Sequence, residues 1–249
     1  MQQKLKVGAV SYLNTKPLIY GFEQGMMSEE IDLVFDYPAN IASRLLNNQI
    51  DIGLVPVAVI PSLPESHIIS DYCIGSDGEV YSVCLFSEVP LNQVETILLD
   101  YQSSTSVALL KILLEEHWKI SPAFVVGPAG YEKQIKGATA GLVIGDRAIE
   151  LQTRIKFVYD LGSAWKEMTG LPFVFATWVS NREPGKKFTT DFNTANAFGL
   201  AHLPEVIKNI HHCPYDLETY YSKHISYLLD ESKLSGMKLF LEYISHATV

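Results

Sequence analysis

The chain has 249 residues, of which 47% are hydrophobic and 19% are charged, and its formal net charge at pH 7 is −9. This length and composition indicate an ordered globular protein with one large or two medium-sized domains. The acidic balance, together with the lack of any lysine or arginine run, makes nucleic acid an unexpected partner.

The sequence also bears on membrane segments, disulfides and metal sites. Residues 1–6 contain no apolar signal segment, and no apolar run approaches the roughly 18 residues that a membrane helix needs. Cys73, Cys84 and Cys213 are odd in number and widely spaced, which is typical of buried thiols in a reducing compartment. We therefore expect a cytoplasmic protein with no membrane contact, no disulfide and no metal site.

The first predicted strand and helix flank a polar turn. The apolar run 5–10 predicts a buried strand, and Pro17 is typical of the first turn of a helix. Ser11, Tyr12 and Asn14 lie between the two. Ligands of open α/β sheets bind at such strand ends, where free backbone N–H groups favour an anion. An ordinary turn with a capping asparagine would show the same residues.

Strands and helices alternate along the rest of the chain, which predicts an α/β protein. Strands are expected over 31–37, 50–60, two runs within 68–86, 96–100, 123–126, 140–146, 156–161 and 171–179. Helices are expected over 38–48, 101–118, 131–136, 147–151, 164–170, 191–210, 217–230 and 234–246.

A second polar turn precedes the strongest helix pattern, 101–118. Four hydroxyl residues, Ser103, Ser104, Thr105 and Ser106, stand at its start. Such a cluster usually only caps a helix. Here it repeats the strand–turn–helix arrangement of the opening stretch, which favours a functional interpretation.

The order of the elements predicts two lobes. Two long apolar strands, 80–86 and 171–179, bracket a middle block with its own strand–helix units. We expect residues 1–85 and 180–249 to form one discontinuous lobe and 86–179 an inserted lobe, with the two strands crossing between them. This is the plan of the type II periplasmic-binding-protein-like fold, which binds its ligand in a central cleft and closes by hinge motion.

Several segments together resemble one enzyme family. They are 11–17 (Ser-Tyr-Leu-Asn-Thr-Lys-Pro), 51–56, 103–106, 141–146, and 160–165 with 171–173. These segments are similar to the menaquinone-biosynthesis enzymes of the futalosine route and, within that group, to the chorismate dehydratase family. The sister family, the cyclic dehypoxanthinyl-futalosine-acting lyases, is expected to carry a histidine where this chain has Ile144-Gly145-Asp146, so the dehydratases are favoured.

The resemblance implies a hydro-lyase that removes water from chorismate to give 3-[(1-carboxyvinyl)oxy]benzoate, without a metal or organic cofactor. Chorismate is a small dianion, and two helix starts facing one cleft would offer one anion site for each carboxylate. The expected substrate-binding residues are Ser11, Tyr12, Ser82, Ser103, Ser104, Thr105 and Ser106, with Ser82 the weakest candidate.

The acid–base chemistry has three possible interpretations. Asn14 can orient a substrate group, but an amide is no general base near neutral pH. Asp146, at the end of a predicted strand, is the best-placed carboxylate, although it could equally be the N-cap of the following helix. The third possibility, which we prefer, is that a carboxylate of the substrate takes the proton while Asn14 positions it.

A function of another class fits the same fold. The chain could be a non-catalytic binding protein or sensor for a small carboxylated metabolite, because a fold alone does not determine function. The linked segments favour the enzyme. Turnover of chorismate would discriminate between the two.

Overall fold

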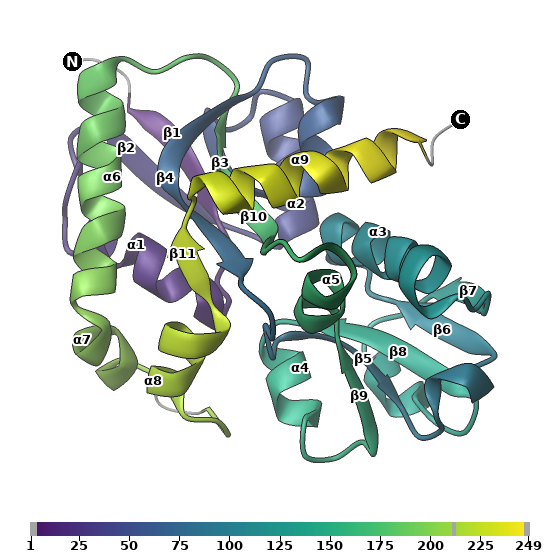
Figure 1. Cartoon of the computed structure of the whole chain (residues 1–249). Helices are drawn as coiled ribbons and strands as arrows, with labels where there is room; N and C mark the ends of the chain where they lie inside the picture. Colours follow the sequence, from purple (N-terminus) through teal and green to yellow (C-terminus); the bar gives the residue numbers. More distant parts are fainter. Residues whose placement is uncertain (1–3, 211–212, 247–249) are drawn as a thin grey trace.

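Two separate β-sheets organise the protein (Figure 1). The structure is a computed structural model, and it describes residues 4–210 and 213–246. The strands of the six-stranded first sheet lie in the order β11-β4-β10-β3-β1-β2. They are β1 (Leu5–Ala9), β2 (Ile31–Phe35), β3 (Ile52–Pro56), β4 (His67–Ser76), β10 (Phe173–Ser180) and β11 (Ser226–Leu228).

The first sheet is mixed. β1 runs parallel to β2 and β3, whereas β10 is antiparallel to both β3 and β4, and β11 is antiparallel to β4. Every residue of β3 is buried, in keeping with its apolar sequence and its central place. The parallel strands β1 and β3 therefore end at the same edge of the sheet.

The second sheet has five strands in the order β7-β6-β8-β5-β9. Its core is the parallel set β7, β6 and β8, to which β5 adds in antiparallel orientation. The strands are β5 (Val83–Ser87), β6 (Thr96–Leu99), β7 (Ala123–Val126), β8 (Thr139–Ile144) and β9 (Phe157–Asp160).

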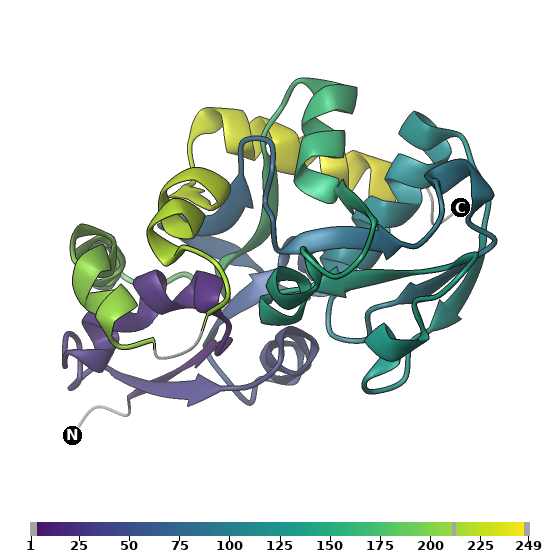
Figure 2. The ribbon, with the colours of Figure 1, turned by 90° about the horizontal axis from the view of Figure 1, so that it is seen from below.

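Helices cover both sheets (Figure 2). The α-helices are α1 (Lys16–Glu23), α2 (Pro38–Leu46), α3 (Ser104–Ile112), α4 (Asp146–Leu151), α5 (Leu161–Thr169), α6 (Lys186–Ala201), α7 (Leu203–Lys208), α8 (Leu217–Thr219) and α9 (Glu231–His246). Short 3₁₀ turns are η1 (Leu13–Thr15), η2 (Val57–Ser62), η3 (Leu91–Gln93) and η5 (Tyr131–Gln134), and π-helical turns are η4 (Leu113–Trp118) and η6 (Tyr220–His224). Across the described ranges, we find no helix with the length and hydropathy of a membrane span.

The chain changes sheet twice. It leaves the first sheet after Ser76 and enters the second at Val83, and it returns between Asp160 and Phe173. From the sequence we expected these changes near 85–86 and 179–180. The first change comes earlier because β5 pairs with β8 and β9 of the second sheet from Val83 onward. The second comes earlier because β10 pairs along its length with β3 and β4, which makes it a full member of the first sheet. We propose that the first and second lobes, each built around one sheet, meet at these two crossings.

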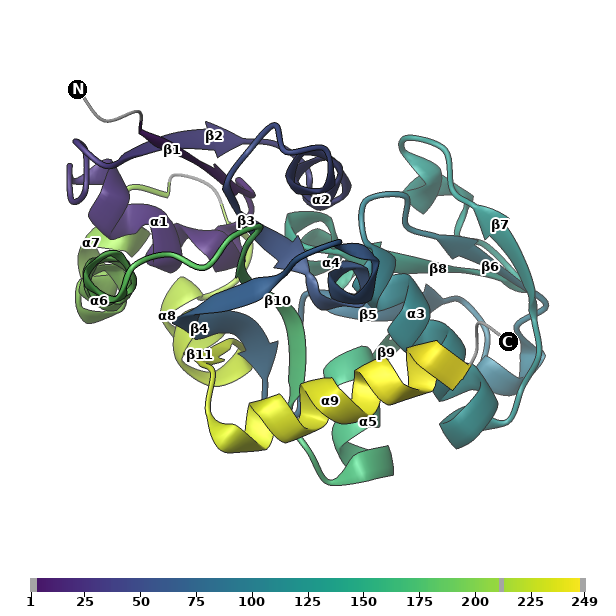
Figure 3. The same ribbon diagram turned by 90° about the horizontal axis from the view of Figure 1, so that it is seen from above.

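The C-terminal helix α9 lies across both lobes (Figure 3). Its buried Phe240 packs edge-on against Phe173 of β10, with ring centroids 4.9 Å apart, and against Trp165 of α5, at 6.1 Å. Phe173 belongs to the first sheet and Trp165 to a helix over the second. The same apolar core therefore extends from one lobe into the other.

One predicted helix is wrong in part. We expected 217–230 to be helical, but only Leu217–His224 is, and Ser226–Leu228 forms the edge strand β11. Tyr227 is 7% exposed while Leu228 is 55% exposed. This alternation, with pairing to β4, stabilises a strand where local sequence allowed a helix.

Candidate active site

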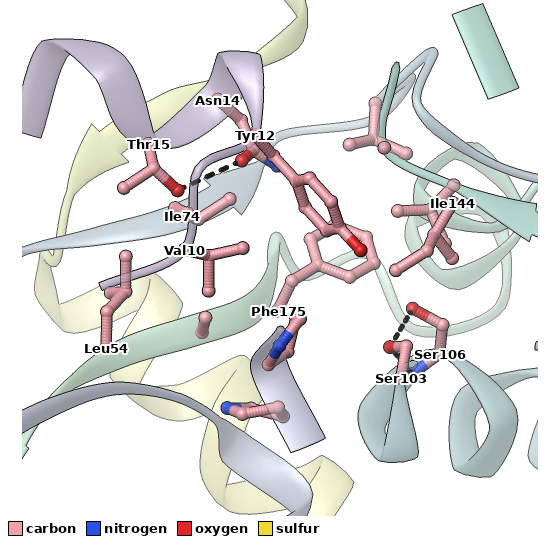
Figure 4. Close-up of a pocket in the computed structure, with 16 residues that line it drawn as sticks. Val10, Tyr12, Asn14, Thr15, Leu54, Ile74, Ser103, Ser106, Ile144 and Phe175 are labelled. Carbon is pink, nitrogen blue, oxygen red and sulfur yellow. Dashed lines mark hydrogen bonds between the residues drawn. The ribbon is translucent and has the colours of Figure 1, made fainter. Parts of the chain in front are cut away.

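A cavity lies between the lobes, where β1, β3 and β8 end (Figure 4). Its volume is about 60 Å³, small beside the roughly 300–1,000 Å³ of typical small-molecule sites. Polar groups reach it from both lobes. The lining residues are Val10, Tyr12, Asn14, Thr15, Pro38, Leu54, Pro56, Ile74, Val80, Val83, Ser103, Ser106, Ile144, Gly145, Phe175 and Ala176.

Asn14 and Tyr12 enter the cavity from the turn after β1. Thr15 Oγ1 donates a long hydrogen bond of 3.4 Å to Asn14 Oδ1, so the amide of Asn14 keeps capacity for a ligand. The Tyr12 ring crosses the cavity toward Ile144 and Ser106 (Figure 4). The turn thus supplies one amide and one phenol to the cavity lining.

Tyr12 connects the two lobes through a polar network. Its hydroxyl donates to Gln102 Oε1, which also accepts from Arg147 Nη2 at 3.0 Å. The same Nη2 donates to the buried carboxylate of Asp100 at 2.6 Å, and Nη1 donates to Glu132 at 2.6 Å. Burial raises the pKa of the Tyr12 phenol far above its usual range, so the phenol stays a hydrogen-bond donor.

Gly145 makes room for the Tyr12 ring. Its φ is +64°, and a Cβ at this position would lie 3.3 Å from the nearest ring carbon of Tyr12. Its amide donates to the backbone oxygen of Ser82 at 2.8 Å. A glycine with positive φ therefore permits the close approach of the lobes here.

Ser103 and Ser106 at the start of α3 face the cavity. Ser103 Oγ accepts from the Ser106 amide at 3.2 Å and donates to Ser106 Oγ at 2.8 Å. The capping interpretation is thus confirmed for Ser103, and both hydroxyls also line the cavity.

The neighbouring hydroxyls behave differently. Ser104 is exposed and does not line the cavity. Thr105 is buried and lies outside the lining; its Oγ1 accepts from the Ala58 amide at 3.1 Å, a hydrogen bond between the lobes. Only some members of the cluster therefore face the cavity, because successive helix positions point about 100° apart.

Asp146 lies beside the cavity but does not line it. Its Oδ1 accepts from the Leu13 amide at 3.1 Å, again across the lobes. The N-cap of α4 is Gly145, and Asp146 is the first residue of the helix, so the N-cap interpretation is wrong. Burial raises the pKa of the Asp146 carboxyl.

Ser11 and Ser82 are not part of the lining. Ser11 is exposed. Ser82 is fully buried, and its Oγ accepts from the hydroxyl of Tyr220 at 2.7 Å. Its backbone oxygen accepts a hydrogen bond from the amide of Gly145, which lines the cavity.

Sequence reasoning missed several contributors to this site. Gln102, Arg147 and Asp100 form the network behind Tyr12, and Thr15 lines the cavity. Gln102 directly precedes the hydroxyl cluster, and Arg147 directly follows Asp146. Both could have been found in the sequence as neighbours of candidate site residues. The apolar walls Ile144 and Phe175 gave no sign, since buried strands look alike in sequence.

Comparison with known proteins identifies the family. A sequence profile described as menaquinone biosynthesis matches residues 5–246. The chain belongs to this family. It is 30% identical to the chorismate dehydratase of Thermus thermophilus, across 95% of this chain and 93% of that protein.

Solved structures confirm the fold. A protein from Archaeoglobus fulgidus matches 98% of both chains with a TM-score of 0.72 at 16% identity. A Candida albicans gene product, described as having the generic periplasmic binding protein fold, matches 98% of this chain and 91% of its own with a TM-score of 0.60 at 13% identity. The predicted two-lobed periplasmic-binding-protein-like fold is thus confirmed, and at these identities the likeness concerns the fold alone.

Proposed function

We propose that this protein removes water from chorismate to give 3-[(1-carboxyvinyl)oxy]benzoate, a step of the futalosine route to menaquinone. One observation carries the proposal. The turn 11–17, one of the segments that resemble the dehydratases, carries Asn14 and Tyr12 into a cavity between the lobes, opposite Ser103 and Ser106. The similarity to the Thermus thermophilus chorismate dehydratase supports the choice of substrate.

The second lobe can bind one substrate carboxylate. The start of α3, a helix of nine residues, presents backbone N–H groups and the positive end of the helix dipole. Because Ser106 Oγ accepts from Ser103, its own proton can donate to a carboxylate oxygen. We propose that Asn14 and Tyr12 bind the other end of the dianion.

The reaction breaks one ring C–H bond and one ring C–O bond, and the proton and hydroxyl leave together as water. No electrons are transferred to another molecule, so the proposed chemistry needs no redox cofactor. The described residues that line the cavity carry no carboxylate, imidazole or amine. This supports our proposal that a carboxylate of the substrate accepts the proton while the Asn14 amide orients it.

Substrate entry requires the lobes to move apart. The cavity is small, and the Tyr12 ring crosses it (Figure 4). Three hydrogen bonds cross between the lobes beside it, and we propose that they break on entry. On closure the bonds of the Leu13 and Ala58 amides form again, whereas the Tyr12 hydroxyl donates to the substrate, and water is excluded from the reaction. The three bonds join Tyr12 to Gln102, Leu13 to Asp146, and Ala58 to Thr105.

Incubation of the purified protein with chorismate, followed by ultraviolet absorbance and mass, tests the proposal. Aromatisation with loss of one water is expected. Asn14→Ala should lower kcat by roughly 100-fold or more, as for removal of an oriented polar group. Ser106→Ala should lower kcat/KM by about tenfold, whereas the exposed Ser104→Ala on the same helix turn is the matched control and should match the unmodified protein.

Two other outcomes would redirect the proposal. Chorismate that binds without reacting would support the sensor or binding-protein alternative. If chorismate neither binds nor reacts, the dehydratase proposal is refuted. The substrates of the sister lyase family would then be tested.

A further inference from the structure

Three tyrosines of the C-terminal segment 220–227 donate hydrogen bonds to the site. Tyr221 donates to the backbone oxygen of Leu13 at 3.0 Å, and Tyr227 donates to the backbone oxygen of Asn14 at 2.9 Å. Tyr220 donates to Ser82 Oγ at 2.7 Å. Their side chains are buried, although Tyr221 and Tyr227 stand 208 and 213 residues from their acceptors.

The Leu13 carbonyl lacks an α-helical donor because of Pro17. In a regular helix the amide four residues on would donate to it, but proline has no N–H. Lys16 N–H donates instead in the 3₁₀ turn η1, and the side chain of its N-cap residue Tyr12 makes no capping hydrogen bond. Tyr221 supplies a second donor to the same oxygen, so the turn that carries Asn14 is held from outside.

Both phenols are fixed donors. Tyr227 lies in β11, whose flanking residues Ser226 and Leu228 pair with β4. Burial raises the pKa of Tyr221 and of Tyr227 above the usual range of a phenol, so both stay protonated at neutral pH. Neither residue lines the cavity, so they act on it only through the backbone of Leu13 and Asn14.

We infer that Tyr221 and Tyr227 are positioning residues that hold the Asn14 side chain in its catalytic orientation. This inference rests on the proposed function for its catalytic part. Fixing the two carbonyls fixes the backbone torsions around Asn14, and those torsions set the direction of its amide. The C-terminal segment, to which the sequence analysis assigned no motif, is thereby part of the site.

Phenylalanine variants test the inference, because Tyr→Phe removes one oxygen and keeps the ring. Tyr221→Phe and Tyr227→Phe should each lower kcat for chorismate by roughly tenfold and the double variant by roughly 100-fold, with KM changed less than about threefold. Tyr243→Phe is the matched control, since Tyr243 lies in α9, packs on Trp165 and does not line the cavity; its kcat should not change. In an Asn14→Ala background the loss from Tyr227→Phe should disappear. A loss of equal size in that background would show general destabilisation and overturn the inference.

Amide hydrogen exchange gives a readout that does not need turnover. Exchange over residues 12–20 should be faster in both variants than in the unmodified protein and in Tyr243→Phe. If the unmodified protein does not dehydrate chorismate, the proposed function fails. Amide exchange still tests whether Tyr221 and Tyr227 anchor the turn, because faster exchange in their phenylalanine variants supports the anchoring. Unchanged exchange over 12–20 overturns it.

Discussion

Replacing Asp146 by asparagine separates two roles for this residue. As a general base, Asp146 would take the proton from the substrate. As a connection between the lobes, it only accepts a hydrogen bond from the Leu13 amide at 3.1 Å. Asparagine keeps an acceptor oxygen of the same reach but cannot act as a base. The structure favours the connection, because Asp146 does not line the cavity.

The two roles predict losses of rate of different size for the Asp146→Asn variant. Loss of a general base lowers the rate by roughly 10²–10⁴-fold. With the acceptor retained, we expect Asp146→Asn to keep kcat within about threefold of the unmodified protein. Asp146→Ala removes the acceptor, which makes closure of the lobes less favourable by about 1 kcal/mol. We therefore expect kcat/KM to fall by roughly fivefold.

The assay is steady-state chorismate dehydration, measured at one pH for all variants. Glu150→Gln is the control, because it makes the same charge change at an exposed position of the same helix. A drop of more than about 100-fold in kcat for Asp146→Asn, with a melting temperature no lower than that of the unmodified protein, would refute our reasoning and establish Asp146 as the base.

Three further predictions concern stability. Burial raises the pKa of Asp146 in the folded state, so its ionisation destabilises the fold as the pH rises from the carboxyl's ordinary pKa through the raised one. The melting temperature of Asp146→Asn relative to the unmodified protein should therefore rise as the pH increases above about 4, and a difference that does not change with pH would contradict the burial argument. Asp160→Asn should lower the free energy of unfolding by about 1–3 kcal/mol in urea titrations, since its carboxylate accepts three backbone N–H groups, one from Tyr81 at a φ of +65°. Gly199→Ala should cost about 1–3 kcal/mol by the same measurement, because its Cβ would lie 1.8 Å from the backbone oxygen of Pro17; an unchanged midpoint would mean that α1 and α6 separate easily.

The fold could be predicted because its apolar runs are long and regularly spaced. The alternation of strands and helices, and the two long strands around the middle block, carry over into the two sheets. The strand Ser226–Leu228 could not be foreseen, because its pairing partner β4 (His67–Ser76) lies far away in the sequence. Tertiary pairing overrides local propensity in such short segments.

The candidate site could be predicted to the level of turns but not of single side chains. The sequence singled out both polar turns, and Asn14, Tyr12, Ser103 and Ser106 do line the cavity. Ser104 stands between two lining serines and is exposed. Which member of a cluster faces the cavity depends on how the turn is rotated about its own axis. That rotation is set by tertiary contacts with distant parts of the chain.

For the first turn, these contacts come in part from the end of the chain. The turn after β1 meets Asp146 and Gln102 on one side, through Leu13 and Tyr12, and the C-terminal tyrosines on the other. In the entry step that we propose, the hydrogen bonds from the second lobe to this turn break, so an anchor is needed that stays when the lobes part. We expect the C-terminal segment to be that anchor, since β11 pairs within the same sheet as β1 and so moves with Asn14 rather than with the second lobe.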